Sequence, residues 1–213
     1  MRTILVTNAK GGCGKSTIAT NLAAYYASEG YETVLADFDP QGSSLDWLAE
    51  RPAEYGPITG LKAFEDGLNQ LPRGTEFLIV DAPARSTGKE LTTLLRRAES
   101  VIVPVLPSPI DMKAAAKFIS ELLSTRKVSD KKAKVAVVAN RVRENTLIFD
   151  ELDEYLSKVK VPYVASFREA QNYIRSYQRG LGIHELPPYL AWPDWEQWEP
   201  LLEWLESKRS QPK

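Results

Sequence analysis

The sequence predicts an α/β fold in which a doubly wound, mostly parallel sheet is flanked by helices on both faces. Short, continuous apolar runs of the kind buried inside parallel sheets recur along the chain, and they alternate with segments of helical periodicity. The first apolar run leads directly into a glycine-rich loop. The 213 residues contain no internal repeat, low-complexity tract or obvious linker, so we expect a single domain over residues 1–213.

The individual elements follow from apolar runs and from helical spacing, taken in chain order. An apolar strand over residues 3–7, a helix over residues 15–29 that ends at Gly30, and a second strand over residues 33–38 form a βαβ unit. Further strands are expected at residues 77–80, 101–106, 135–139 and 162–166, with helices at residues 44–50, 89–97, 112–126 and 145–159. The rest of the segment 43–73 is punctuated by Pro and Gly and predicts no clear element.

The composition excludes several classes of protein. A formal net charge of −1 excludes a chain that is basic overall, so nucleic acid could be bound only by a local patch. Cys13 is the only cysteine, which excludes an internal disulfide and a multi-cysteine metal site within one chain. The sequence predicts neither a signal peptide nor a membrane span, and we expect a cytoplasmic protein.

Residues 9–17 form the loop around which the chain is organised. A strand that runs through glycines into a helix exposes several backbone N–H groups at the helix start, an arrangement that suits a chain of phosphates. Lys15 supplies a charge to the β- and γ-phosphates, and the Ser16 hydroxyl can bind Mg²⁺. The loop departs from the general pattern because Ala9 replaces its first glycine and a second lysine, Lys10, precedes the glycine pair.

Three aspartates at strand ends complete the predicted site. The run of residues 77–80 ends on Asp81, where P-loop proteins place the carboxylate that holds Mg²⁺ directly or through water. Asp39 follows the second strand and is placed to orient a water toward the γ-phosphate. Asp37, two residues earlier, is expected to support the water shell of the metal. The carboxyl ends of parallel strands bring all three to the glycine-rich loop.

These motifs resemble those of the ParA/MinD family of P-loop ATPases. Residues 10–17 (KGGCGKST) look like the deviant Walker A motif of that family, and residues 37–42 (DFDPQG) look like its second motif, with Asp81 as the third. The similarity continues through residues 104–109 and 138–141 to about residue 185.

The resemblance implies an ATPase that forms a homodimer with two ATP molecules between the subunits. Lys10 would reach the partner's nucleotide and act in hydrolysis with Lys15 and Asp39, and Gly12 would allow close approach of the subunits. Nucleotide and metal contacts are implied for two overlapping sets: Gly11, Gly12, Cys13, Gly14, Lys15, Ser16, Thr17, Asn140 and Arg141 for ATP, and Ser16, Asp37, Asp39 and Asp81 for Mg²⁺. Cys13 itself is interpreted as a packing residue.

Members of this family act on the nucleoid, on the membrane or with an iron–sulfur cluster, and the single cysteine excludes the cluster. A helical wheel of residues 168–179 places a stripe of Arg168, Asn172, Arg175 and Arg179 opposite Ala170, Tyr173, Ile174 and Tyr177. We therefore expect Arg168, Arg175 and Arg179 to bind DNA phosphates without reading bases. A second basic run at residues 126–134 either adds to this patch or is a solvated loop.

A helix expected at residues 194–207 places Trp195, Trp198 and three leucines opposite four glutamates. Membrane-surface helices favour Lys and Arg on their polar face, so this acidic face argues against a membrane anchor. The tryptophans are expected to dock onto the body of the domain or, less readily, onto a partner.

The sequence thus favours a short, ParA-type partition or positioning ATPase with slow, partner-stimulated hydrolysis. It would associate with the nucleoid through nonspecific DNA, not with a membrane. Its cargo would be a plasmid, a chromosome region or a protein body such as a carboxysome, reached through a ParB-like or McdB-like adaptor. The alternatives are a small-molecule P-loop kinase or ligase related to dethiobiotin synthetase, and a membrane-associated regulator similar to MinD.

Overall fold

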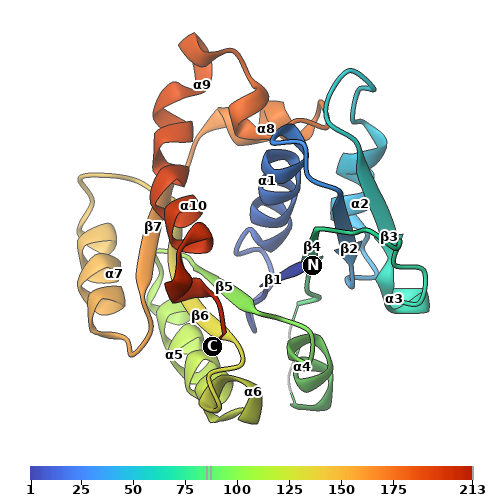
Figure 1. The fold of residues 1–213 in the computed structure, drawn as a ribbon. Coiled ribbons are helices and arrows are strands. Elements are labelled where there is room, and N and C mark those ends of the chain that lie inside the picture. Colours follow the sequence, from blue (N-terminus) through green and yellow to red (C-terminus); the bar gives the residue numbers. More distant parts are fainter. Residues whose placement is uncertain (85, 87, 213) are drawn as a thin grey trace.

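The computed structural model describes residues 1–84, 86 and 88–212, and these residues contain one seven-stranded sheet in the order β3-β2-β4-β1-β5-β6-β7 (Figure 1). The strands are β1 Arg2–Val6, β2 Thr33–Asp37, β3 Ile58–Lys62, β4 Phe77–Asp81, β5 Ser100–Val105, β6 Lys134–Val142 and β7 Tyr163–Arg168. Every neighbouring pair is parallel. The doubly wound prediction is therefore confirmed, and the sheet is parallel throughout.

Helices cover both faces of the sheet in two layers (Figure 1). One layer contains α1 Lys15–Ser28, α2 Ser43–Ala49, α8 Gln171–Tyr177, α9 Pro188–Trp195 and α10 Glu199–Glu206. The other contains α3 Ala63–Asp66, α4 Gly88–Leu95, α5 Pro109–Ser124, α6 Arg126–Ser129 and α7 Leu147–Lys158. Three short 3₁₀ helices, η1 Ile183–Glu185, η2 Glu196–Trp198 and η3 Lys208–Ser210, lie in the last third of the chain.

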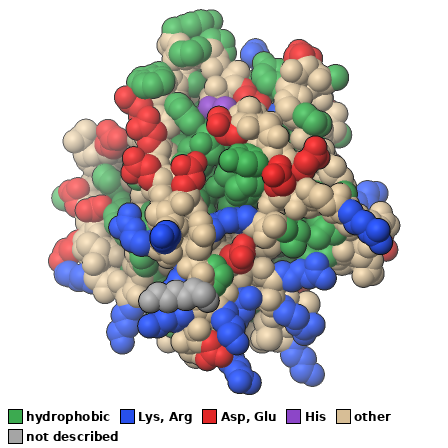
Figure 2. All heavy atoms as spheres, viewed as in Figure 1, with side chains coloured by type: hydrophobic (Ala, Val, Ile, Leu, Met, Phe, Trp, Pro, Cys, Tyr) green, Lys and Arg blue, Asp and Glu red, His purple; other side chains and the backbone are tan. Residues whose placement is uncertain are grey.

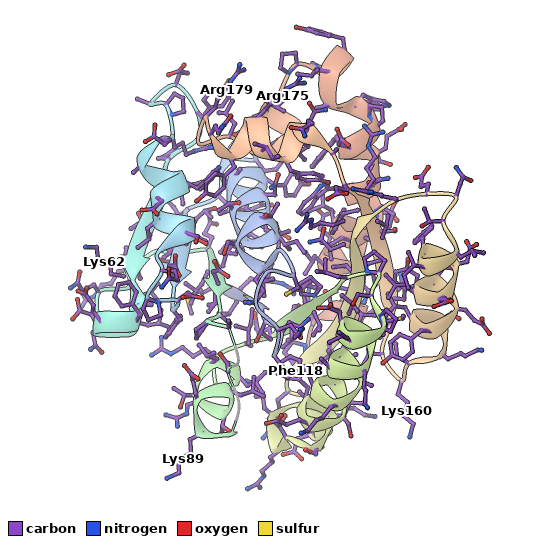
Figure 3. The ribbon with its side chains drawn as sticks, turned by 180° about the vertical axis from the view of Figure 1, so that it is seen from behind. Lys62, Lys89, Phe118, Lys160, Arg175 and Arg179 are labelled. Atoms are coloured by element: carbon purple, nitrogen blue, oxygen red, sulfur yellow. The ribbon has the colours of Figure 1, made fainter. Side chains whose placement is uncertain are left out.

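The strands are continuous apolar runs because both faces of the sheet are buried. In β1, Leu5 packs into one hydrophobic cluster while Ile4 and Val6 pack into the other, as the alternation of side chains along a strand requires. Phe118 of α5, which is 1% exposed, fills the first cluster (Figure 3).

The strand β3 was not predicted from the sequence. It is an edge strand with a mostly exposed or half-buried pattern, so its residues form no continuous apolar run. A Cβ on Gly60 would lie 2.6 Å from Leu48 Cδ2 of α2. Glycine at this position therefore lets α2 pack closely against the edge strand.

The expected helix at residues 194–207 is broken into the end of α9, η2 and α10, with Pro193 inside α9 and Pro200 at the start of α10. The expected docking onto the domain is confirmed, since Trp198 is 1% exposed and its ring stacks on Phe167 with centroids 4.5 Å apart. The glutamates of the acidic face are exposed. Within the described residues, no helix combines the length and apolar character that crossing a bilayer requires.

Arg2 joins the first strand to the last turn of the described chain. Its Nη2 donates hydrogen bonds to Ser100 Oγ at 2.9 Å, to Leu205 O at 2.9 Å and to Ser210 Oγ at 2.7 Å. Ser100 Oγ in turn donates to Ser210 O at 2.7 Å. Residues near the two ends of the described chain are therefore hydrogen-bonded to each other beside the beginnings of β1 and β5.

His184 gives the fold a specific pH dependence. The ring lies between Tyr25 and Trp195, with Nε2 3.0 Å from Ser28 Oγ, and burial lowers its pKa from 6.5 to about 4. Between these pH values the unfolded chain binds more protons, so the stability contributed by neutral His184 is complete above about pH 6.5 and is lost as the pH falls toward 4.

We predict that His184→Gln reduces the loss of unfolding free energy between pH 7.5 and pH 5 by about 2 kcal/mol, because glutamine does not titrate. Urea denaturation of both proteins at the two pH values measures the difference. Equal losses in the two proteins would contradict the prediction.

Candidate functional site

The glycine-rich loop between β1 and α1 is shaped by close contact with β6. Gly14 caps α1 in a left-handed conformation, with φ of +89°, and its carbonyl accepts the first helical hydrogen bond from Ile18 N. A Cβ on Gly14 would lie 2.1 Å from Asn140 Nδ2, which donates to Cys13 O at 2.8 Å. Glycine is required here by both the backbone conformation and the approach of Asn140.

The loop holds its catalytic candidates in different environments. Lys15 is 7% exposed, and its Nζ donates to Lys10 O at 3.1 Å. Lys10 is half-buried, and its backbone N–H donates to Asn8 Oδ1. Cys13 is fully buried, burial raises the pKa of its thiol, and Sγ contacts Lys10 O at 3.4 Å. These contacts agree with the packing interpretation of Cys13.

Two buried carboxylates end adjacent strands beside this loop. Asp37 and Asp81 are paired in register across β2 and β4. Asp37 accepts from Asp39 N at 2.9 Å and from Ser44 N at 3.0 Å, while Ser44 Oγ donates to Asp81 Oδ2. Burial raises the pKa of both, that of Asp81 to about 6, against the lowering effect of the Ser44 and Ser16 hydroxyls on Asp81.

Asp81 is suited to a metal ion and its waters. Its Oδ1 is buried and has no hydrogen-bond partner among the described residues. Among the described residues, no group of three or more His, Cys, Asp or Glu side chains is arranged to hold a metal ion by itself. A site with one carboxylate and the Ser16 hydroxyl fits Mg²⁺, which keeps several waters and takes phosphate oxygens as further ligands.

Asp39 connects the segments that follow β2 and β4. Its Oδ1 accepts from Gln41 N at 3.0 Å, and its Oδ2 accepts from Ala84 N at 3.3 Å. Asp39 and Ala84 both face the cleft described next. The carboxylate is therefore held at the mouth of the site by backbone donors from two loops.

A cleft of about 630 Å³ opens at the carboxyl ends of the strands. Its walls are the glycine-rich loop on one side and α8, with Tyr173, Ile174 and Tyr177, on the other. This volume lies within the range of small-molecule and cofactor sites. The turn after α8 is fixed by buried Arg51, which donates to Gly180 O at 3.0 Å and pairs with Glu185 at 2.7 Å.

The rim of the cleft carries a cluster of ion pairs. Arg141 has a positive φ of +52°, and its guanidinium pairs with Glu169 at 2.9 Å. Arg143 pairs with the other oxygen of Glu169 at 2.6 Å. Asn140 and Arg141 both line the cleft, so the structure brings these two predicted nucleotide contacts to the loop.

The predicted DNA-binding stripe is wrong in its geometry. Arg168 does not lie on the helix, because it ends β7 in register with Val142, and its guanidinium pairs with the fully buried Asp194. Asn172 is also buried and donates to Asp194 Oδ2 at 2.7 Å.

The side of this helix expected to face the core is partly in solvent, with Ile174 53% exposed. Tyr177 is 36% exposed, and its hydroxyl donates to Ser43 O at 2.8 Å. Arg175 lies on α8 and Arg179 in the turn that follows it, so Arg179 too falls outside the predicted helical stripe; both are exposed, point away from α1 (Figure 3) and remain candidates for DNA contact.

Sequence reasoning missed three parts of the site: Ser44, Glu169 and the cleft-lining face of α8. Ser44 comes two residues after the Asp37 motif, at the start of α2, but nothing in its sequence context marks it as a partner of Asp81. The pair of arginines at 141 and 143 offers the only signal for Glu169, a nearby carboxylate that could neutralise them.

Residues 4–183 match the CobQ/CobB/MinD/ParA nucleotide binding domain. The chain belongs to this family. The matched residues include the glycine-rich loop, the three aspartates and the segments that line the cleft.

The chain is similar to two curated relatives over different shares of its length. It is 29% identical over 197 residues to maintenance of carboxysome distribution protein A of Halothiobacillus neapolitanus, covering 86% of this chain and 87% of the relative. It is 31% identical over 159 residues to the chromosome-partitioning ATPase Soj of Thermus thermophilus, covering 59% of this chain and 63% of that protein.

Among solved structures, an ATP complex of a Cyanothece McdA variant superposes with a TM-score of 0.70 at 15% identity, covering 94% of this chain and 96% of the other. At that identity the likeness concerns the fold alone.

We predict that Asp81→Asn raises the Mg²⁺ concentration needed to support nucleotide binding by about 10–100-fold, because it removes the negative charge of the carboxylate whose Oδ1 has no partner. ATP affinity titrated with Mg²⁺ and with chelator measures the effect. The exposed Glu90→Gln serves as a control. An unaltered Mg²⁺ titration in Asp81→Asn would remove Asp81 from the metal site.

Proposed function

We propose that this protein is a ParA-type ATPase that dimerises on ATP, binds DNA without sequence preference and positions a cargo through an adaptor protein. The observation that supports the proposal is the cleft of about 630 Å³, whose lining includes Lys15, Asp39 and glycines of the loop. Gly11 and Gly12 are exposed and Lys10 is half-buried, so the loop is accessible to a second subunit.

The residues of the cleft are proposed to divide the chemistry of ATP hydrolysis. The loop N–H groups and Lys15 would hold the β- and γ-phosphates, with the Lys15 ammonium exchanging Lys10 O for phosphate oxygens. Bound Mg²⁺ would supply charge neutralisation. Asp39 would give up its longer hydrogen bond, to Ala84 N, and accept one from the attacking water.

Lys10 is proposed to act on the nucleotide of the partner subunit. A cation supplied from a neighbouring protein neutralises charge that develops on the transferred phosphoryl group, and such groups contribute about 10³–10⁵ in rate. Hydrolysis would then be slow until two subunits and an adaptor are assembled. This behaviour suits a switch better than a metabolic kinase or ligase.

The cargo proposed first is a protein body of the carboxysome type, because a relative that matches 86% of this chain over 87% of its own length is a carboxysome distribution protein. A plasmid or chromosome region is the second choice, in view of the similarity to Soj. The proposed location is the cytoplasm, on the nucleoid. The exposed glutamates of α10 support the absence of a membrane anchor.

We predict that Asp39→Ala binds ATP normally but hydrolyses it at least about 100-fold more slowly, because the water loses its acceptor. Phosphate release and equilibrium binding of a fluorescent ATP analogue measure the two properties. The exposed Asp150→Ala should match the wild type in both. Near-normal turnover of Asp39→Ala would exclude the assigned role.

We also predict that Lys10→Ala binds ATP but remains monomeric and loses hydrolysis, since its proposed contact is made only in the dimer. Sedimentation velocity with ATP and Mg²⁺ measures the oligomeric state. The exposed Lys62→Ala is the matched control. If Lys10→Ala dimerised and hydrolysed ATP as the wild type does, the cross-subunit lysine would be ruled out.

A further inference from the structure

The end of the sheet opposite the cleft carries a concentration of positive charge. Glu99 directly precedes β5, and Lys134 begins β6, so the segments before these strands lie together at the amino edge of the sheet. We call the cationic side chains of these two segments the basic end: Arg96, Arg97, Arg126, Lys127, Lys131, Lys132 and Lys134. In Figure 2, Lys and Arg gather over the lower part of the molecule, where α4, α5 and α6 lie in Figure 1.

The charge of the basic end is poorly neutralised from within. Seven cationic side chains share these two segments with two carboxylates, in a chain whose formal net charge is −1. Asp130 pairs with Arg126 at 3.4 Å and with Lys132 at 3.9 Å, yet those cations remain 93% and 67% exposed. Glu99 is engaged by Thr3 N at 3.2 Å. The two carboxylates therefore neutralise only part of the positive charge of the basic end.

The backbone beneath these cations is firmly anchored. Val128, Ala133 and Ala98 are buried, and they fix both segments to the core. Lys127 joins the segments, because its Nζ donates to Arg96 O at 3.1 Å and its carbonyl accepts from Lys132 N at 3.0 Å. A hollow of about 480 Å³ lies between the segments, lined by cations from both. Glu99 is the one acidic residue in that lining, beside Arg96, Arg97, Lys127 and Lys132, so the hollow keeps an excess of positive charge on an anchored backbone.

We propose that the basic end binds the phosphate backbone of duplex DNA without reading its sequence, an inference that rests on the proposed function and relocates its DNA surface. Clustered, solvent-accessible lysines and arginines neutralise phosphates and release counterions, which is the basis of nonspecific binding. The basic end lies away from the nucleotide cleft, so dimerisation through the cleft leaves it accessible.

A duplex fits this surface better than an anionic membrane does. The acidic Glu32 and Glu76 precede β2 and β4 at the same edge of the sheet, and both are exposed. A flat anionic bilayer covering the whole edge would meet these carboxylates, whereas a rod-like duplex can lie across the basic end alone.

Two charge-matched double variants test the proposal: Lys131→Glu with Lys132→Glu in the basic end, and, as the α8 variant, Arg175→Glu in α8 with Arg179→Glu in the turn after it. Fluorescence anisotropy measures binding of each full-length protein to a random-sequence duplex over a salt series, with ATP and Mg²⁺ present. We expect the basic-end variant to lose at least about tenfold in affinity and to reduce the salt slope by about 2, and the α8 variant to match the wild type. ATP binding should be unchanged in both.

Three outcomes would overturn the inference. Loss of DNA binding in the α8 variant alone would assign the surface to α8, and equal loss in both would indicate a general charge effect. Stronger binding of the wild type to phosphatidylglycerol vesicles than to DNA, abolished in the basic-end variant, would assign the surface to a membrane. Failure of the proposed function is distinguishable, because wild-type protein would then bind ATP without binding DNA or would bind neither.

Discussion

The candidate site depends on keeping two carboxylates, Asp37 and Asp81, next to each other at the ends of buried strands. Removing a carboxylate from water is unfavourable unless hydrogen-bond donors compensate it. Here Ser44 compensates both, through its backbone N–H to Asp37 and its hydroxyl to Asp81. One residue of α2 therefore links the helix to both carboxylates, and the sheet supplies the rigid support that keeps them together.

This arrangement leaves one oxygen atom of Asp81 without a partner beside Lys15 and Ser16. A buried acceptor that the protein does not satisfy is unusual, and such groups are found where a ligand completes the structure. The fold thus holds a preorganised acceptor in place at the expense of its own stability. The Lys15 ammonium donates to a loop carbonyl rather than to a carboxylate, so a phosphate can replace that partner without breaking an ion pair.

The central strands, the glycine-rich loop and the aspartates could be predicted because each is specified locally, by a buried apolar run, by glycines or by a strand end. The edge strand β3 could not be predicted, since its mostly exposed pattern is also typical of a loop. Gly60 is needed for a close contact with α2, and that contact cannot be recognised from the sequence. Arg168 was misplaced for a related reason. Pairing with β6 extends β7 through that residue, and this tertiary contact outweighs the helical spacing of its arginines.

The bonds of Arg2 affect how the protein is made. The central strand β1 precedes the other strands along the chain, but its neighbours β4 and β5 begin at residues 77 and 100, and the partners of Arg2 lie at positions 100, 205 and 210. Contacts of such sequence separation form slowly, because much of the chain must be ordered before they are made. The apolar strand β1 therefore stays unpaired until residues about 75 to 100 positions further along the chain are available, and an unpaired apolar strand is prone to aggregate during that interval.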